Sequence, residues 1–306
     1  MNNIALRDNK TNFESLAKAS GLNMESNNKN NNSMLARLKI SHTPIMGQTE
    51  IKGKITKVEV VSGGMYKLED VENSKTYYSS NVSVRPFLQR FMYKKWVKPE
   101  GEHGHYIKTV MSDNLNNDLK DSSGGFNCGK PAGYIKDYNA LPETTKNIIK
   151  GIKRVRAILG TATFKDIVDD QGNSVEDSAV NNKPMIWEID NRDAFKTLSE
   201  PFSKCSNLKH LPLQQTIDVT TDEMPLPNGN SFYLPKVKFN VKEVPITDKD
   251  ESLWVDLLAW VDNYNTYIFD QWTKNADNSQ QDKLSKENED LVDSFVDVEM
   301  QEDAKK

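Results

Sequence analysis

The sequence predicts a mainly β fold of the α+β class, with a C-terminal packing helix and disordered termini. Apolar and polar residues alternate through much of 34–97, which is the pattern of half-buried strands. From 248 to about 272 the apolar residues instead recur every three or four positions, which predicts an amphipathic helix. Residues 1–33, with the Asn-rich run SNNKNNNS, and 275–306 are polar. We therefore expect one domain over 34–274, with inserted loops and helices, between a disordered N-terminal arm and a disordered acidic tail.

The composition is that of a soluble protein. Of the 306 residues, 36% are hydrophobic, and the mean hydropathy is -0.70. No apolar run approaches the roughly 18 to 20 residues that span a bilayer, and the N-terminus lacks the hydrophobic region of a signal peptide. Cys128 and Cys205 are far apart and in no CxxC pair, which argues against a disulfide framework or a Cys-rich zinc site. We expect no membrane association and a cytoplasmic location, the host cell cytoplasm if the protein is viral.

Charge is distributed unevenly along the chain. The formal net charge is -4, yet residues 275–306 alone hold ten acidic residues against four lysines. The rest of the chain is therefore mildly basic. A basic body with an acidic end is typical of proteins that contact nucleic acid.

The strands before residue 98 are predicted to form a β-meander. LARLKIS and TEIKGKITKVEVV alternate, SGG at 62–64 is a turn signal, and MYKLED is the returning strand. VENS at 71–74 is the next turn, before KTYYSSNVSV and the stretch 83–98.

Helices and strands are mixed after residue 142. Pro142 begins a helix through TTKNIIKGIKR, which leads into the strand VRAILGTATF. PMIWEID is a strand, and Asp190 or Asn191 caps the following helix RDAFKTLSEPF. Asn-Gly within PNGN at 227–230 predicts a hairpin.

The C-terminal helix has both a start signal and an apolar stripe. Thr247 with Asp250, or Asp248 with Glu251, offers a capping box. The stripe consists of Leu253, Leu257, Val261, Tyr264, Ile268 and Trp272. We expect this stripe to dock on the sheet.

The stretch 83–98 is the densest mixture of cations and aromatic rings. An extended backbone places Phe87, Phe91 and Tyr93 on one face. Arg90, Met92, Lys94, Trp96 and Lys98 then share the other face. One face can be core while the other is a cationic surface with an exposed ring, the mixture that binds phosphates and unpaired bases. The alternative is a partly buried strand with solubilising Lys and Arg on its wet side.

Two further segments could contact a polyanion. The loop GGFNCGKPAGY at 124–134 has the spacing of a phosphate-binding P-loop, but Pro131 stands where Ser or Thr is required, which argues against an NTPase. We expect an ordered binding loop and leave open whether it touches DNA. The helix after Pro142 carries Lys146, Lys150, Lys153 and Arg154 on its polar side, which is either a second basic cluster or a solvated face.

Motifs of catalysis are absent from the sequence. It contains no HExxH, GxSxG or kinase set, and its four histidines have no recognisable nucleophile nearby. His103 and His105 lie two apart, but without a nearby Cys or carboxylate they indicate a loop pair and not a metal site. We expect no enzyme activity, no metal and no cofactor, with a nuclease that uses scattered carboxylates as the alternative.

The acidic tail combines charge with apolar residues. Its candidate partner-binding residues are Asp290, Asp293, Phe295, Asp297 and Glu299. A tethered polyanion raises local competition for a cationic groove, and its displacement by DNA would free the apolar residues for a partner. A plain solubilising tail is the alternative.

Taken in order, these segments resemble a bacteriophage single-stranded DNA-binding protein. The similarity covers roughly 34–274 in style and order, through IKGKITKVEVVSGGMYKLED, RPFLQRFMYKKW, NCGKPAGYIKDYNALPETTKNIIKGIKRVRAILGTAT and MIWEIDNRDAF, and it includes the tail. Such a protein has an OB-type barrel with loop and helix insertions. One departure is the end of the chain, Ala304-Lys305-Lys306, where such tails commonly have a terminal aromatic residue.

The resemblance implies a function and a set of contacts. The protein would coat single-stranded DNA non-specifically during replication, recombination and repair, with a replication polymerase or helicase as a partner of the tail. The implied DNA contacts are Arg85, Arg90, Tyr93, Lys94, Lys95 and Trp96, with Lys130, Lys150, Lys153, Arg154 and Arg156 as secondary contacts. Homo-oligomerisation stays open. The competing hypothesis is a non-enzymatic virion structural or assembly protein.

Overall fold

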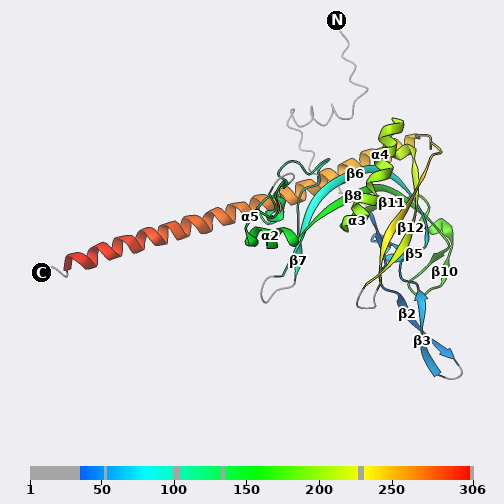
Figure 1. Ribbon diagram of the computed structural model, residues 1–306, viewed down its shortest axis with the longest axis horizontal. Helices are drawn as coiled ribbons and strands as arrows, with labels where there is room; N and C mark the ends of the chain where they lie inside the picture. The colour runs from blue at the N-terminus through cyan, green and yellow to red at the C-terminus, as the bar shows by residue number, and fades with distance from the viewer. Residues whose placement is uncertain (1–34, 52–53, 99–103, 132–134, 227–230, 304–306) are drawn as a thin grey trace, which may run out of the picture. The chain divides into compact units, whose positions relative to one another are not determined.

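The computed structural model describes residues 35–51, 54–98, 104–131, 135–226 and 231–303 (Figure 1). The side chains of Glu50, Ile51 and 277–303 lie outside this description, as do the predicted N-terminal arm 1–33 and His103. The described part is mainly β, as the sequence predicts, with one large mixed sheet and few helices.

Thirteen strands are described, of which eleven form one sheet. Its order is β10-β9-β5-β4-β1-β11-β8-β6-β12-β13, and β7 pairs with β6 off this path. The pair β1 and β11 is parallel, and the other described pairs are antiparallel. The strand bounds are β1 Ala36–Ile40, β2 Ile45–Ile51, β3 Lys54–Val61, β4 Tyr66–Asp70, β5 Lys75–Ser79, β6 Asn81–Val97, β7 His105–Lys108, β8 Ile152–Lys165, β9 Ile167–Val168, β10 Ser174–Val175, β11 Lys183–Ile189, β12 Thr216–Pro225 and β13 Ser231–Asn240.

The predicted meander is wrong at one pairing. β3 does not return along β4; it pairs with β2 in a separate two-stranded sheet, while β4 pairs with β1 and β5. Alternation defines a strand but not its neighbour, which is why the sequence could not distinguish these pairings. The hairpin predicted around PNGN is confirmed by the β12–β13 ladder, although residues 227–230 lie outside the description.

The large sheet curls around a central core. Strands β4 and β12 are five positions apart in the sheet order, so about 24 Å would separate them if the sheet were flat. Instead the Tyr66 hydroxyl donates to the Thr220 carbonyl at 3.1 Å, and Thr221 Oγ1 donates to the Gly64 carbonyl at 2.8 Å. Backbone ladders do not close the ring, so no closed barrel is seen among the described strands. The core shared by six of these strands includes Leu38, Tyr66, Leu68, Val84, Ile158, Phe164, Trp187 and Ile217.

Strands β6 and β8 are the longest and pair over most of their length (Figure 1). The pairing contains a β-bulge between Pro86 and Leu88, where Gly160 lies under the bulged backbone. A Cβ on Gly160 would lie 2.2 Å from the Arg85 carbonyl oxygen, so a side chain there would displace the strand. The bulge reverses the alternation of faces. Phe87 consequently packs in a different cluster from Phe91, contrary to the simple period-two prediction.

Helix α5 (Asp248–Asp303) covers the opposite face of β6 and β8 from the central core. Its start is the predicted capping box, since Thr247 N and Oγ1 donate to Asp250 at 2.9 and 2.8 Å and Asp250 N donates to Thr247 Oγ1 at 3.4 Å. The predicted stripe docks as expected, with Leu257 and Val261 in a second core cluster. The helix continues past Trp272, its expected end.

The other helices are short. They are α2 Glu143–Lys150, α3 Arg192–Thr197 and α4 Ser199–Leu208, with 3-10 turns η2 Asn127–Gly129, η3 Asp177–Val180 and η4 Pro212–Gln214. Asn191 caps α3 by accepting from Asp193 N and Ala194 N. Within the described residues, no helix combines the length and apolar character needed to cross a membrane.

Candidate nucleic-acid interface

The two basic clusters predicted from distant parts of the sequence lie side by side in the sheet. Helix α2 ends at Lys150, with Gly151 as its C-cap, so Lys153 and Arg154 belong to β8 and not to the helix exterior expected from sequence. Across the β6–β8 ladder Lys94 faces Lys153, and Tyr93 faces Arg154. Antiparallel pairing therefore joins lysines of both sequence clusters on one face of the sheet. We call this face the basic corner, and it comprises Lys94, Trp96, Tyr106, Lys108 and Lys153. Lys95 and Arg154 lie on the opposite face, which Tyr93 shares.

Strand β7 supplies the second ring of an aromatic pair in the basic corner. Trp96 faces Tyr106 across the β6–β7 ladder, and their ring centroids are 4.8 Å apart in an edge-to-face arrangement. Gly104 lies against the indole, since a Cβ there would be 2.3 Å from Trp96 Cζ2. Nevertheless Trp96 is 53% exposed and Tyr106 44% exposed. The two rings are thus held in position and still reachable from solvent.

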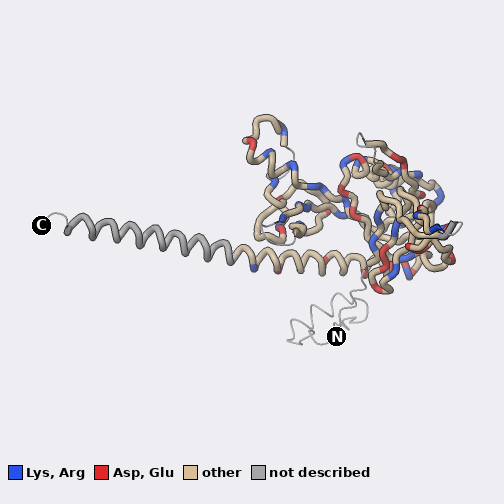
Figure 2. The backbone as a smooth tube through the Cα atoms, turned by 90° about the horizontal axis from the view of Figure 1, so that it is seen from below, with Lys and Arg blue, Asp and Glu red and all other residues tan. Residues whose placement is uncertain are grey.

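Two carboxylates of β11 and its C-terminal end neutralise part of this positive charge. Asp190 lies 3.1 Å from Lys94 Nζ and 3.0 Å from Lys153 Nζ, and Glu188 lies 3.1 Å from Lys108 Nζ. Burial alone would raise the pKa of Asp190, but Lys94 and Lys153 outweigh it and hold that pKa below its ordinary value. Lys94 Nζ also lies 5.2 Å from the Tyr106 ring centroid. The ion pairs thus hold the lysines beside the rings. Along the rest of the described chain, Lys and Arg are likewise interspersed with Asp and Glu (Figure 2).

The ring of Tyr93 is not available for base stacking in this structure. It is 2% exposed and packs with Leu119 and Cys128, on the opposite face of β6 from Trp96. Lys130 Nζ lies 5.3 Å from the Tyr93 ring centroid, and burial, with a further contribution from Arg154, lowers the pKa of Lys130. Tyr93 was predicted both on the core face and among the DNA contacts, and its burial agrees with the first prediction.

Two of the predicted contact arginines are engaged inside the protein. Arg85 forms a bidentate ion pair with Asp250 at 2.8 and 3.2 Å and donates from Nε to the Leu213 carbonyl. Arg156 is buried and donates to Gln89 Oε1. Its guanidinium lies 4.6 to 5.9 Å from the ring centroids of Phe91, Phe195 and Phe202. Burial lowers the pKa of Arg156 to about 10.

The remaining predicted contacts are more accessible. Arg90 is partly exposed and donates to the Gln89 carbonyl. Lys95 is also partly exposed, and Lys150 is exposed in the last turn of α2. The predicted tail contacts Asp290, Asp293, Phe295, Asp297 and Glu299 lie outside the described side chains.

The predicted binding loop is ordered around Asp121 in its described part. The buried Asp121 carboxylate accepts from Ser123 N, Gly125 N and Cys128 N at 2.8 to 3.2 Å. The amides of residues 127, 129 and 130 donate to carbonyls within the loop. These amides are consequently not directed at a phosphate, which agrees with the exclusion of a P-loop. Burial raises the pKa of the Cys128 thiol to about 12, with Asp121 adding to the effect.

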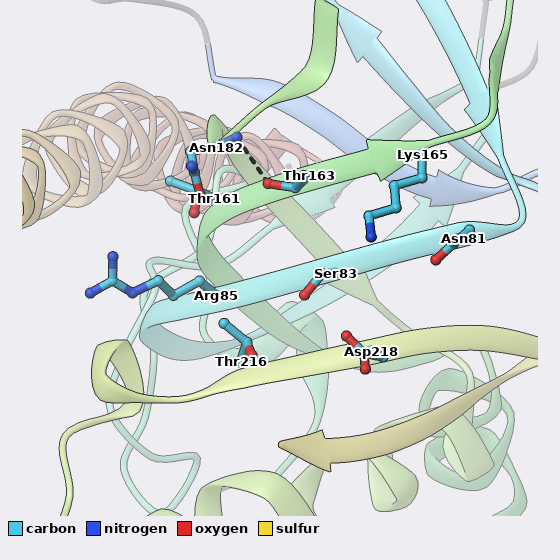
Figure 3. A pocket seen from close by; sticks show the side chains of 9 residues that line it. All are labelled: Asn81, Ser83, Arg85, Thr161, Thr163, Lys165, Asn182, Thr216 and Asp218. Carbon is cyan, nitrogen blue, oxygen red and sulfur yellow. Dashed lines mark hydrogen bonds between the residues drawn. The ribbon is translucent and has the colours of Figure 1, made fainter. Parts of the chain in front are cut away.

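A polar pocket of about 350 Å³ lies at the other end of β6 and β8 (Figure 3). The lining side chains come from β6, β8, β12 and the turn before β11: Asn81, Ser83, Arg85, Thr161, Thr163, Lys165, Asn182, Thr216 and Asp218. Ser83 faces Thr163 on one neighbouring strand and Asp218 on the other. Asn182 N donates to Thr163 Oγ1 at 3.0 Å. Sequence reasoning did not identify this pocket, because small polar residues at every second position become a site only when three strands lie together.

The pocket and the basic corner have different chemistry. The pocket lining contains no aromatic side chain, its Arg85 is neutralised by Asp250, and Lys165 shares the lining with Asp218. The basic corner has accessible rings and more cations than carboxylates.

Among the described residues, no three His, Cys, Asp or Glu side chains are grouped to hold a metal ion. No protein-family model, curated protein or solved structure matches the chain.

Proposed function

We propose that the protein binds single-stranded DNA non-specifically at the basic corner, in the manner of the phage single-stranded DNA-binding proteins that the sequence resembles. The observation that supports this most is the register of β6, β7 and β8, which places the exposed Trp96–Tyr106 pair beside Lys94, Lys108 and Lys153. The proposal includes an OB-like scaffold, which the curling of the sheet supports, since side-chain hydrogen bonds connect β12 with Tyr66 of β4 and with the turn before β4.

Each part of the basic corner has a physical task in this proposal. Lysine and arginine replace counterions along the phosphates, so binding weakens as salt rises. An exposed ring stacks on any base, which contributes about 1–3 kcal/mol per base without sequence preference. Because Trp96 already rests on Gly104 and Tyr106, little conformational entropy is lost when a base stacks on it.

The competing explanation for the ring pair is purely structural. Cross-strand aromatic pairs stabilise antiparallel strands by about 0.2–1 kcal/mol. A structural pair would contribute to hairpin stability only, whereas a stacking site also changes nucleic-acid affinity. The two explanations therefore differ in a binding experiment.

The test is fluorescence anisotropy of labelled oligo-dT with folded variants. Trp96→Ala should weaken binding about five-fold or more, and Trp96→Phe should retain most of the affinity, because the ring is kept. Lys153→Gln should flatten the dependence of log affinity on log salt by up to about 0.7, the effect of one phosphate contact on a single strand. Lys236→Gln is the matched control, since Lys236 is also exposed and ion-paired, at 3.4 Å to Asp222 on β12. Equal affinity of Trp96→Ala and the parent protein would refute this site.

The acidic tail is proposed to compete with DNA for the basic corner and to recruit a polymerase or helicase. Truncation after Ala276 removes most of the acidic segment and keeps Trp272 and Asn275, which bond the loop 122–125. Binding of oligo-dT should tighten in the truncated protein. A virion structural protein, the second candidate, would leave single-stranded DNA cellulose at low salt and would not respond to the truncation.

A further inference from the structure

A second group of aromatic rings lies where α5 meets the loop after β7. Lys120 Nζ is 4.1 Å from the Phe269 ring centroid and 4.0 Å from that of Trp272. Phe126 packs edge-to-face on Trp272 at 5.8 Å. Phe126 is 44% exposed and Phe269 46% exposed. These four residues, which we call the Lys120 cluster, thus present two half-exposed rings around one cation.

Hydrogen bonds to the backbone hold this cluster in place. Trp272 Nε1 donates to the Gly125 carbonyl at 3.0 Å, and Asn275 Nδ2 donates to the Ser122 carbonyl at 2.7 Å. Gly124 has a φ of +89° and lies so close to α5 that a Cβ would be 2.8 Å from Ala276 N. These contacts hold Trp272 against the loop, and Phe126 and Phe269 pack on Trp272, so the rings are positioned without a ligand.

Backbone pairing connects the segment that carries the Lys120 cluster to the strand that carries part of the basic corner. The Lys108 carbonyl accepts from Ser122 N, and the Lys120 carbonyl accepts from Val110 N. Residues 120–122 therefore pair with residues 108–110, at and just after the end of β7. Lys120 then bridges to Phe126. Four residues along the strand and two strand spacings separate Tyr106 from Phe126, which corresponds to roughly 16 Å.

We propose that the Lys120 cluster is a second base-stacking platform for the strand bound at the basic corner. This inference rests on the proposed function. Lys120 forms no ion pair with any described residue, so its charge is not cancelled by a described carboxylate. A cation at the centre of the rings is unfavourable for an apolar protein partner and favourable for a base with its phosphate.

The experiment compares oligo-dT of about 4 and about 16 nucleotides, the range of site sizes of single OB folds. Phe126→Ala and Phe269→Ala should each weaken binding of the long oligonucleotide about five-fold or more, and leave the short one at its parental affinity. Tyr267→Ala is the matched control, because Tyr267 is an exposed ring on α5 outside the cluster. Thermal unfolding of each variant confirms that it is folded. Lys120→Gln, which keeps the rings, should flatten the salt dependence of affinity for the long oligonucleotide only.

The outcomes separate the two proposals. If Trp96→Ala weakens both oligonucleotides while the Phe126 and Phe269 variants match the parent on the long one, the second platform is wrong and the basic corner stands. The second platform would also be wrong if Phe126→Ala and Phe269→Ala weakened binding of both oligonucleotides equally, or if Tyr267→Ala lost as much affinity as they do. Absence of oligo-dT binding by the parent protein would overturn both proposals. A protein that binds the parent but not the two phenylalanine variants, with DNA affinity unchanged, would reassign the rings to a protein partner.

Discussion

Replacing Arg85 by Met should destabilise the fold without weakening DNA binding. The Arg85 guanidinium joins β6 to the start of α5 through Asp250 and to the turn before β12 through the Leu213 carbonyl. The side chains of Arg85 and Asp250 are only 13% and 12% exposed. Methionine keeps most of the side-chain volume, so the substitution removes the charge and the hydrogen bonds with little cavity formation.

The expected loss follows from the burial of the pair. Removing one partner of a buried ion pair costs about 3–5 kcal/mol, because the other charge stays buried. About an eighth of each side chain is in solvent, and Asp250 keeps its bonds from Thr247, so we expect a value near 3 kcal/mol. In a chain of this size, with roughly 2–4 °C per kcal/mol, the melting temperature should fall by roughly 6–12 °C.

The pH dependence of stability tests whether the Arg85–Asp250 pair causes the loss. Burial alone would raise the pKa of Asp250, but hydrogen bonds from Thr247 and the contacts with Arg85 outweigh it and lower that pKa. A carboxyl group with a lowered folded-state pKa stabilises the fold above its unfolded pKa of about 4 and loses that contribution as pH falls through the folded value. The stability difference between the parent and Arg85→Met should therefore be complete at neutral pH and shrink in acid.

Urea unfolding at neutral pH measures the difference in free energy of unfolding between the parent and Arg85→Met. Fluorescence anisotropy with oligo-dT measures DNA binding by the folded variant. Lys236→Met is the control, because its exposed ion pair with Asp222 should contribute no more than about 1 kcal/mol. A loss of stability below about 1 kcal/mol for Arg85→Met, together with weaker DNA binding, would refute the structural role and restore the DNA contact predicted from sequence.

Three further substitutions test the basic corner and the loop. Asp190→Asn removes the carboxylate that neutralises two corner lysines, so oligo-dT affinity should rise about two- to ten-fold and its salt dependence should steepen; weaker binding in a salt titration would instead mean that the carboxylate serves to position the lysines. Gly104→Ala should displace the Trp96 indole, change tryptophan emission and weaken oligo-dT binding, since the added Cβ would lie 2.3 Å from the ring; unchanged emission would contradict the close packing. Asp121→Ala removes the acceptor of several loop donors and should destabilise by roughly 2 kcal/mol, with faster hydrogen exchange at the Cys128 amide; parental exchange rates there would show that another group holds the loop.

Local patterns predicted the elements well where only neighbouring residues decide them. The Thr247–Asp250 box, the Asn191 cap and the apolar stripe of α5 are all present in the structure. The alternation of β6 also placed Tyr93 on a buried face. These features depend on backbone periodicity and short-range hydrogen bonds, which a sequence displays directly.

The candidate site was less predictable, because its composition depends on pairing between distant strands. Arg85, Arg156 and Lys153 are all basic residues in a basic context, yet the structure binds the first to Asp250, buries the second among phenylalanines and exposes the third beside Lys94. The partners of these cations are from 37 to 165 residues away in the sequence. No local pattern distinguishes the three environments.

The sequence by itself determined the mainly β class, the amphipathic C-terminal helix, the acidic end of the chain and the alternation of faces within regular stretches of strand. Only the tertiary structure decided which strands are neighbours, where the bulge at Pro86 reverses the faces of β6, and which cations are left accessible. The physical reason is that periodicity is set within one strand or helix, whereas strand register and the partner of each buried charge are set by packing between segments far apart along the chain.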